Sequence, residues 1–103
     1  MSKQTKESTN TSVLTRNNVR HIRRYKVILH NDDYTTFDFV IEVLMQIFNK
    51  PFEEAQTITY SVHENGLGIA GIYTREIAEM KVSEVHIAAE NAGFPLRASY
   101  QPE

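Results

Sequence analysis

Hydrophobic and polar residues divide this chain into two unequal parts. Residues 1–24 hold five hydrophobic residues, whereas all ten aromatic residues lie at Tyr25 or later. A segment so poor in apolar side chains buries too little surface to offset the entropy lost on ordering the chain. We therefore predict a disordered extension over residues 1–24 and one folded domain over residues 25–103.

The folded part opens with a strand pattern and continues with a strongly apolar helix. Residues 25–30 alternate between two fairly apolar faces, which predicts a strand. From Phe37 to Phe48 nine of twelve residues are apolar and the polar ones recur every four positions, which predicts a helix with one narrow polar stripe. Thr35 is expected to be its N-cap residue. Such a helix must be covered almost all round, or one flank must line a ligand groove.

The pattern between residues 52 and 65 is ambiguous. Residues 57–62 alternate as in a strand, and Asn65-Gly66 is a frequent hairpin sequence. Gly66 suits a helix C-terminus equally well. A second set of residues recurs at helical spacing: Phe52, Ala55, Thr59 and Val62. The local pattern does not decide between strand and helix.

The C-terminal part predicts a strand, a helix and a strand. Residues 67–74 are nearly all apolar and include Gly68 and Gly71, which predicts a central strand with close backbone packing. A helix is expected over residues 75–91 and a short strand over residues 96–100. With a helix in the ambiguous segment, the order β-α-α-β-α-β around a three-stranded sheet indicates an α+β or α/β sandwich.

The net charge of −2 hides a strong asymmetry. The first 24 residues carry a net charge of +5 and the remainder a net charge of −7. An acidic domain repels phosphates, so we expect no nucleic-acid partner. No apolar run approaches the ~18 residues of a membrane span, no apolar signal segment follows the basic N-terminus, and cysteine is absent. These features favour a cytoplasmic protein without a membrane partner, a metal site or another cofactor.

A polar cluster at residues 30–33 stands between the first strand and the apolar helix, and His63 lies near the end of the ambiguous segment. One hypothesis is metal-dependent hydrolysis by His30, Asp32, Asp33 and His63, but no metalloenzyme spacing accompanies them. A second is a purely structural turn. A third is a site for a cation beside an apolar pocket, as a free peptide N-terminus with a hydrophobic first side chain would need.

Specific motifs then indicate a family. The run over residues 25–35, YKVILHNDDYT, closely resembles the start of the ClpS adaptor family. The resemblance resumes at Val62-His63, continues over residues 71–82 (GIYTREIAEMKV) and ends at Pro95-Leu96. It covers essentially all of residues 25–103, in order and with matching spacing.

The resemblance implies a function that the residue patterns alone do not give. Proteins of this kind are adaptors rather than enzymes. They bind proteins whose first residue is Leu, Phe, Tyr or Trp and dock on the N-terminal domain of the unfoldase ClpA, or ClpC in some lineages, which feeds the ClpP protease. The implied fold is an antiparallel three-stranded sheet with three helices in a monomer, with a helix across residues 52–65.

The resemblance also implies roles for individual residues. Ligands of the substrate's α-amino group, with their loop neighbours, are Asn31, Asp32, Asp33, Thr35 and His63. Residues that line the hydrophobic pocket are Leu29, Phe37, Val40, Thr59, Val62 and Leu96. Glu76 and Lys81 belong to the face that contacts the unfoldase. The basic extension resembles a tether that the unfoldase engages.

Two pocket positions depart from the family's common pattern. Phe37 stands where Met is common, and Thr59 replaces a more apolar residue. Because Phe is stiffer and larger than Met, we expect Phe37 to narrow the pocket entrance and to penalise β-branched first residues. An alternative function for the same fold is a ribosome-associated interaction module.

Overall fold

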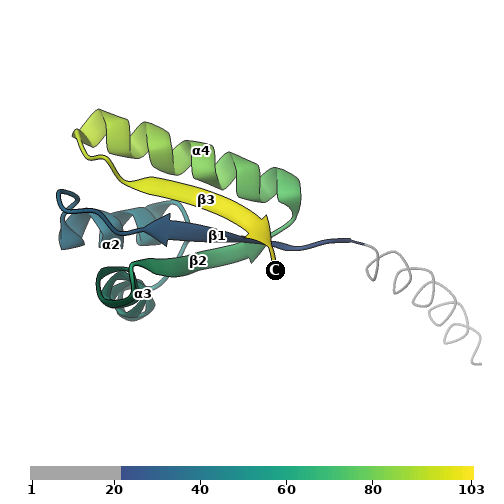
Figure 1. Cartoon of the computed structure of the whole chain (residues 1–103), viewed down its shortest axis with the longest axis horizontal. Helices are drawn as coiled ribbons and strands as arrows, with labels where there is room; N and C mark the ends of the chain where they lie inside the picture. Colours follow the sequence, from purple (N-terminus) through teal and green to yellow (C-terminus); the bar gives the residue numbers. More distant parts are fainter. Residues whose placement is uncertain (1–21) are drawn as a thin grey trace, which may run out of the picture.

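The computed structural model describes residues 22–103, which form one antiparallel sheet and three helices. Their elements are β1 (Tyr25–His30), α2 (Phe37–Gln46), α3 (Phe52–Asn65), β2 (Leu67–Tyr73), α4 (Arg75–Ala92) and β3 (Arg97–Pro102) (Figure 1). The strand order is β2-β1-β3, with β1 in the centre. The predicted α+β fold is therefore confirmed. The predicted extension over residues 1–24 lies outside the described residues, apart from its last three.

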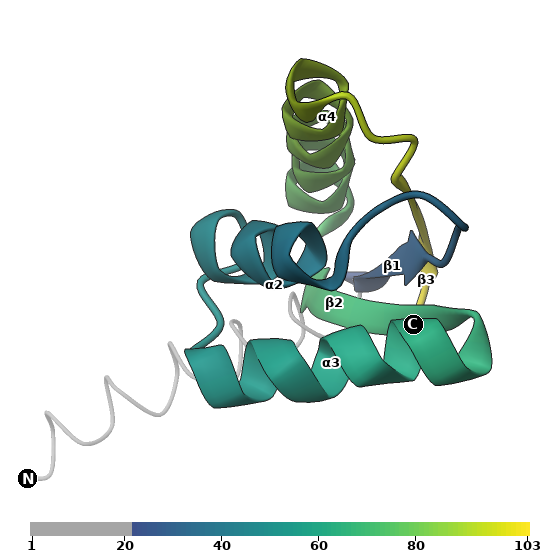
Figure 2. The same cartoon turned by 90° about the vertical axis from the view of Figure 1, so that its left-hand side faces the viewer.

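The helices pack against the sheet and against one another. α4 packs across β3 and β1, α3 packs against β2, and α2 lies beside α3 (Figure 2). Between them lies a core that includes Val27, Leu29, Val43, Leu44, Val85 and Ala89. On β2, Leu67 and Ile69 alternate with the buried Gly68 and Ala70 and are each 45% exposed, so the sheet keeps an open face. Within residues 22–103, no helix combines the length and apolarity needed to cross a membrane.

The N-cap of α2 is Thr36, and the prediction of Thr35 was wrong. Thr36 has an extended backbone, and its hydroxyl oxygen accepts a hydrogen bond of 3.1 Å from the N–H of Phe39. The Thr35 hydroxyl instead donates to the carboxylate of Asp32. The side chain that fixes the preceding loop therefore decides which of the two adjacent threonines caps the helix.

α2 ends at Gln46, two residues before the predicted end at Phe48. The N–H of Lys50 donates to the carbonyl of Leu44 at 3.0 Å, which closes the chain over the last helical turn. Asn49 adopts a left-handed backbone with a φ of 56°, a conformation that asparagine tolerates better than most residues. This reversal directs the chain into α3.

The ambiguous segment is a helix, α3, as the family resemblance implied. Ala55, Thr59 and Val62 form its buried stripe, and the Thr59 hydroxyl donates to the Ala55 carbonyl at 2.7 Å. Gly66 ends the helix with a φ of 88° and donates its N–H to the Val62 carbonyl at 3.0 Å. A strand former such as Thr59 is accommodated because its hydroxyl is satisfied within the helix.

β2 is an edge strand, so the predicted central position of residues 67–74 was wrong: β1 occupies the centre of the sheet. The close backbone packing predicted for the same strand is confirmed at Gly68. A Cβ atom at this position would lie 2.8 Å from the Val62 side chain and 3.2 Å from the Ile58 carbonyl, both on α3. β2 also contains a bulge, because Val27 pairs with Gly71 whereas Ile28 pairs with Ile69. The missing side chain of Gly68 lets α3 lie directly on β2.

β3 spans Arg97–Pro102, which corrects the predicted strand over residues 96–100. Leu96 precedes the strand and is buried in the core. The N–H of Ala98 is directed away from β1 and donates to Nε2 of His86 on α4, at 3.0 Å. After the strand, the N–H of Glu103 donates to the Arg24 carbonyl at 2.8 Å, which extends the pairing beyond the predicted end.

Candidate functional site

The loop between β1 and α2 is organised around the carboxylate of Asp32. Its Oδ1 accepts hydrogen bonds from the N–H groups of Tyr34 (2.8 Å) and Thr35 (2.7 Å), and its Oδ2 accepts one from the Thr35 hydroxyl (2.7 Å). Burial raises the pKa of Asp32, but the hydrogen bonds from Thr35 and Tyr34 outweigh it, so the pKa is lowered. The lowered pKa keeps Asp32 ionised. A carboxylate offers about four lone-pair sites, so Asp32 retains room for another donor beside these hydrogen bonds.

A backbone hydrogen bond fastens this loop to the end of α3. The N–H of Asn31 donates to the carbonyl of Gly66 at 2.9 Å. Gly66 follows the last turn of α3, which carries His63. Asn31 and His63 are both exposed. The structure therefore brings the predicted amine ligands Asn31, Asp32 and His63 to one corner of the molecule, and it gives Thr35 the task of orienting Asp32. Asp33 is exposed in the same loop.

Phe37, the first residue of α2, lies between two rings of α3. Its ring meets that of Tyr60 edge-on, with centroids 5.2 Å apart, and that of His63 edge-on, with centroids 5.5 Å apart. One ring thus joins the predicted hydrophobic pocket to the predicted amine site. Tyr60 is absent from the predicted site, although its position three residues before His63 places both on one helical face.

The other predicted pocket residues are part of the closed interior. Each of them is at most 5% exposed: Leu29, Val40, Thr59, Val62 and Leu96. Four belong to the hydrophobic core, and the fifth, Thr59, is a buried polar residue. Phe37 is the half-buried member of the predicted set. These five side chains therefore serve the packing of the fold.

His30 has a different environment from the amine-site candidates. Its Nε2 lies 2.7 Å from the hydroxyl of Ser99, the β3 residue that pairs with Ile28. Burial, and secondarily the positive charge of Arg97, lower the pKa of His30. The imidazole is therefore biased toward its neutral form and bonded to β3.

The predicted unfoldase-contacting residues Glu76 and Lys81 both lie on α4. Glu76 is exposed in the first turn. Lys81 is half-buried, and its ammonium donates a hydrogen bond of 2.6 Å to the carbonyl of Ile47 at the end of α2. The same ammonium lies 6.0 Å from the ring centre of Phe48 and 5.8 Å from that of Tyr73. Lys81 therefore has an internal role in addition to any external one.

The metal-hydrolase hypothesis required four side chains to converge. Within residues 22–103, no three histidine, aspartate or glutamate side chains gather closely enough to hold a metal ion. His30 is engaged with Ser99, and Asp32 with its own loop. The geometry therefore gives that hypothesis no support.

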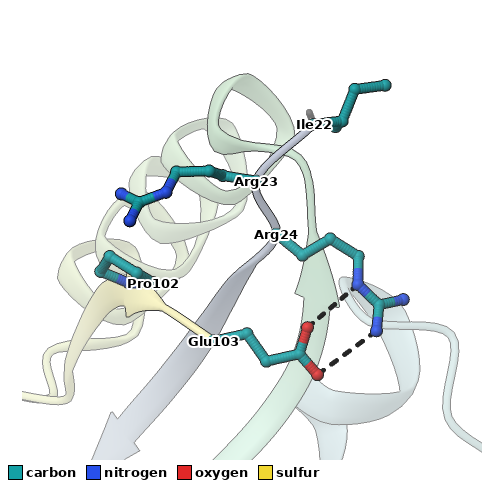
Figure 3. A pocket seen from close by; sticks show the side chains of 5 residues that line it. All are labelled: Ile22, Arg23, Arg24, Pro102 and Glu103. Atoms are coloured by element: carbon teal, nitrogen blue, oxygen red, sulfur yellow. Dashed lines mark hydrogen bonds and ion pairs between the residues drawn. The ribbon is translucent and has the colours of Figure 1, made fainter. Parts of the chain in front are cut away.

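Surface hollows also occur elsewhere on the described part of the domain, and two of them are the larger ones. One of about 340 Å³ runs between α3 and β2, lined by Thr57, Ile58, Ser61, Asn65, Leu67, Gly68 and Ile69. Another of about 220 Å³ lies where the two ends of the described chain meet, lined by Ile22, Arg23, Arg24, Pro102 and Glu103 (Figure 3). In the second, Nε of Arg24 lies 3.0 Å from Oε1 of Glu103. Neither hollow includes a residue of the Asp32 loop.

Comparison with known proteins identifies the family. The family described as "ATP-dependent Clp protease adaptor protein ClpS" matches residues 20–99. The ClpS adapter protein of Lawsonia intracellularis is 51% identical over 89 residues, covering 86% of this chain and 82% of that protein. The chain belongs to the ClpS family. The ClpS of Wolinella succinogenes is 60% identical over 76 residues, or 74% of each chain.

A solved structure agrees with this assignment. ClpS2 of Agrobacterium tumefaciens, bound to L-phenylalaninamide, superposes with a TM-score of 0.78 at 35% sequence identity, covering 81% of this chain and all of that one. ClpS proteins are adaptors of the Clp protease and not catalytic enzymes. The predicted resemblance is confirmed, and the alternative of a ribosome-associated module is set aside.

Proposed function

We propose that this ClpS protein binds polypeptides by their N-terminal amino group and a first side chain of Leu, Phe, Tyr or Trp, and delivers them to the ClpA or ClpC unfoldase. The observation that carries the proposal is the loop organised by Asp32 beside the rings of Phe37 and His63. The ligand of the related ClpS2, L-phenylalaninamide, joins a free amine to an aromatic side chain and so supports it.

The amine would be held by Asn31, Asp32 and His63. A protonated amine has three donors and no acceptor, so it fits a carboxylate oxygen, an amide oxygen and a neutral imidazole nitrogen. Three internal hydrogen bonds orient the Asp32 carboxylate before any ligand arrives. All three bonds involve a charged donor, but Asp32 is the one ligand of the three with a negative charge, so it should contribute most.

The first side chain would enter beside Phe37 and displace part of the packing above Val40, Val62 and Leu96. Burying a side chain as large as Leu or Phe contributes about 1.5–3 kcal/mol. Leu29 and Thr59 would complete the walls, and the Thr59 hydroxyl brings no unsatisfied group because it donates to Ala55. The pocket would then select by size and apolarity.

Delivery would use another surface. Glu76 and Lys81 on α4 would contact the N-terminal domain of the unfoldase, and the first 24 residues would act as the tether that the unfoldase engages. The charge pattern supports different tasks for the tether and the folded domain, since the first 24 residues carry a net charge of +5 and the rest a net charge of −7.

The test is fluorescence anisotropy with labelled peptides that differ only in their first residue. Peptides beginning with Leu, Phe, Tyr or Trp should bind, whereas those beginning with Ser or carrying an acetylated amine should not. Asp32→Asn and His63→Ala should weaken binding about ten- to a hundredfold through loss of a hydrogen bond to a charged group. Glu64→Ala, an exposed neighbour of His63, is the matched control. Equal binding of free and acetylated peptides would refute the proposal.

A further inference from the structure

Phe37, Tyr60 and His63 form a cluster of three rings, and of these Tyr60 has no role in the proposed site. Tyr60 lies on α3, three residues before His63. It is 54% exposed, so packing of the hydrophobic core does not explain why a large ring stands at this position. It meets Phe37 edge-on at 5.2 Å with an interplanar angle of 76°. This contact links a surface residue of α3 to the first residue of α2.

Phe37 depends on such a contact because of its place in the helix. Helical side chains point back over the preceding turn, which normally restricts their rotamers. As the first residue of α2, Phe37 has no preceding turn of its own helix beneath it. Its ring is positioned from α3 instead, by Tyr60 on one side and by His63, at 5.5 Å and 74°, on the other.

We propose that Tyr60 is a specificity-determining residue that acts by holding Phe37 as a fixed wall at the pocket entrance. The inference rests on the proposed function, because it assumes that the first side chain of the substrate passes Phe37. A wall that is held by two rings cannot swing aside to admit a wider group. Leu and Phe would pass this wall most readily. The larger indole of Trp would still bind but more weakly, and Ile, which is branched at Cβ, would be disfavoured most.

The contact requires the ring of Tyr60 and not its hydroxyl. Tyr60→Phe should therefore keep the selectivity, whereas Tyr60→Ala should free Phe37 to move toward the vacated space. An edge-on aromatic pair is worth about two- to tenfold in an equilibrium constant. Because Tyr60 acts through Phe37, its removal should have no effect once the Phe37 ring is gone.

The experiment is a double-mutant cycle read as a selectivity ratio. Dissociation constants are measured by anisotropy for peptides beginning with Leu, Phe, Trp or Ile, against wild type, Tyr60→Ala, Tyr60→Phe, Phe37→Ala and the double variant Tyr60→Ala/Phe37→Ala. Tyr60→Ala should lower the Trp-to-Leu ratio of dissociation constants about two- to tenfold, and Tyr60→Phe should leave it unchanged. In the Phe37→Ala background, Tyr60→Ala should leave it unchanged too. Ile87→Ala, at a residue of similar exposure (57%) on α4, is the control.

The outcomes separate this inference from the proposed function. If wild type binds the peptides but Tyr60→Ala weakens all of them by one factor, Tyr60 touches the substrate directly and the inference is overturned. An equal change of the ratio in both Phe37 backgrounds overturns it as well. If wild type binds none of the peptides, the proposed function fails first and the inference falls with it. Nuclear Overhauser contacts between the Phe37 and His63 rings should weaken in peptide-free Tyr60→Ala and persist in Tyr60→Phe.

Discussion

The ammonium of Lys81 lies 2.6 Å from the carbonyl oxygen of Ile47 and so caps the C-terminal end of α2 from a different helix. The last turn of α2 contains no basic residue of its own. A positive charge at this end complements the helix dipole. Lys81 of α4 thereby supplies the positive charge that the last turn of α2 lacks.

We expect Lys81→Met to lower the free energy of unfolding by about 1–2 kcal/mol, because it leaves the Ile47 carbonyl without its charged donor. Urea denaturation measures the change. Lys81→Arg, which keeps the charge, should recover part of it. A Lys81→Met protein that unfolds at the wild-type urea concentration would mean that Lys81 serves only external contacts.

Removing the Asp32 carboxylate should loosen the loop as well as weaken the proposed amine binding. Asp32→Ala leaves two N–H groups and the Thr35 hydroxyl without their acceptor, at an expected cost of about 1–2 kcal/mol in unfolding free energy. Exchange of the Tyr34 and Thr35 amide hydrogens should accelerate. Unchanged exchange would contradict the role of Asp32 as the organiser of the loop.

Asp32 should also make stability depend on acidity. Its pKa is lowered in the folded protein, so the unfolded chain binds a proton more readily. The resulting stabilisation is fully present above the ordinary pKa of 3.8 and is lost as the pH falls through the lowered value. Unfolding free energies measured from pH 5 downward should fall less steeply in Asp32→Asn than in wild type.

His30 should act in a higher pH range and with the same sign. Its pKa is lowered from 6.5, so protonation favours the unfolded chain. Its contribution is fully present above pH 6.5 and disappears as the pH falls through the lowered value. His30→Gln should flatten the stability profile below neutrality, as measured by thermal unfolding in a pH series. An unaltered slope would show that burial of His30 is not the cause.

His86 should protect the outer edge of β3. Because its Nε2 accepts the Ala98 N–H at 3.0 Å, His86→Ala should expose that donor and destabilise the protein by about 1–3 kcal/mol. Exchange of the Ala98 amide should accelerate more than that of the Leu29 amide on the central strand.

The Arg24–Glu103 ion pair should contribute little to stability. Its side chains are 63% and 41% exposed, so Glu103→Ala should change the free energy of unfolding by less than about 1 kcal/mol (Figure 3).

The sequence predicted the order of most elements, because regular patterns mark β1, α2 and α4 and an apolar run marks β2. The sequence did not decide whether residues 52–65 form a strand or a helix. Residues 57–62 alternate as in a strand, whereas Ala55, Thr59 and Val62 recur at helical spacing. Tertiary packing favours the helix, because it buries Ala55, Thr59 and Val62 on the side of α3 that packs against β2. The cap of α2 was misassigned for a similar reason, since only the position of Asp32 distinguishes Thr35 from Thr36.

The candidate site shows the same limit at the level of single side chains. Asn31, Asp32 and His63 were predicted as amine ligands from the motifs that contain them. Tyr60 was missed because an exposed tyrosine on a helix acquires meaning only when α2 is packed beside it. The internal bond of Lys81 spans 34 residues of sequence, and no local pattern predicts a partner at that separation.

The two ends of the described chain meet at one end of the sheet, where Arg24 and Glu103 pair. The Asp32 loop leaves β1 at the opposite end, a strand of six residues away, or about 20 Å. A surface, bead or reporter attached at Glu103 would therefore hold the molecule with its candidate binding corner facing the solution. Immobilised protein should keep the affinity of free protein, which makes this chain suitable for capturing ligands directly from mixtures.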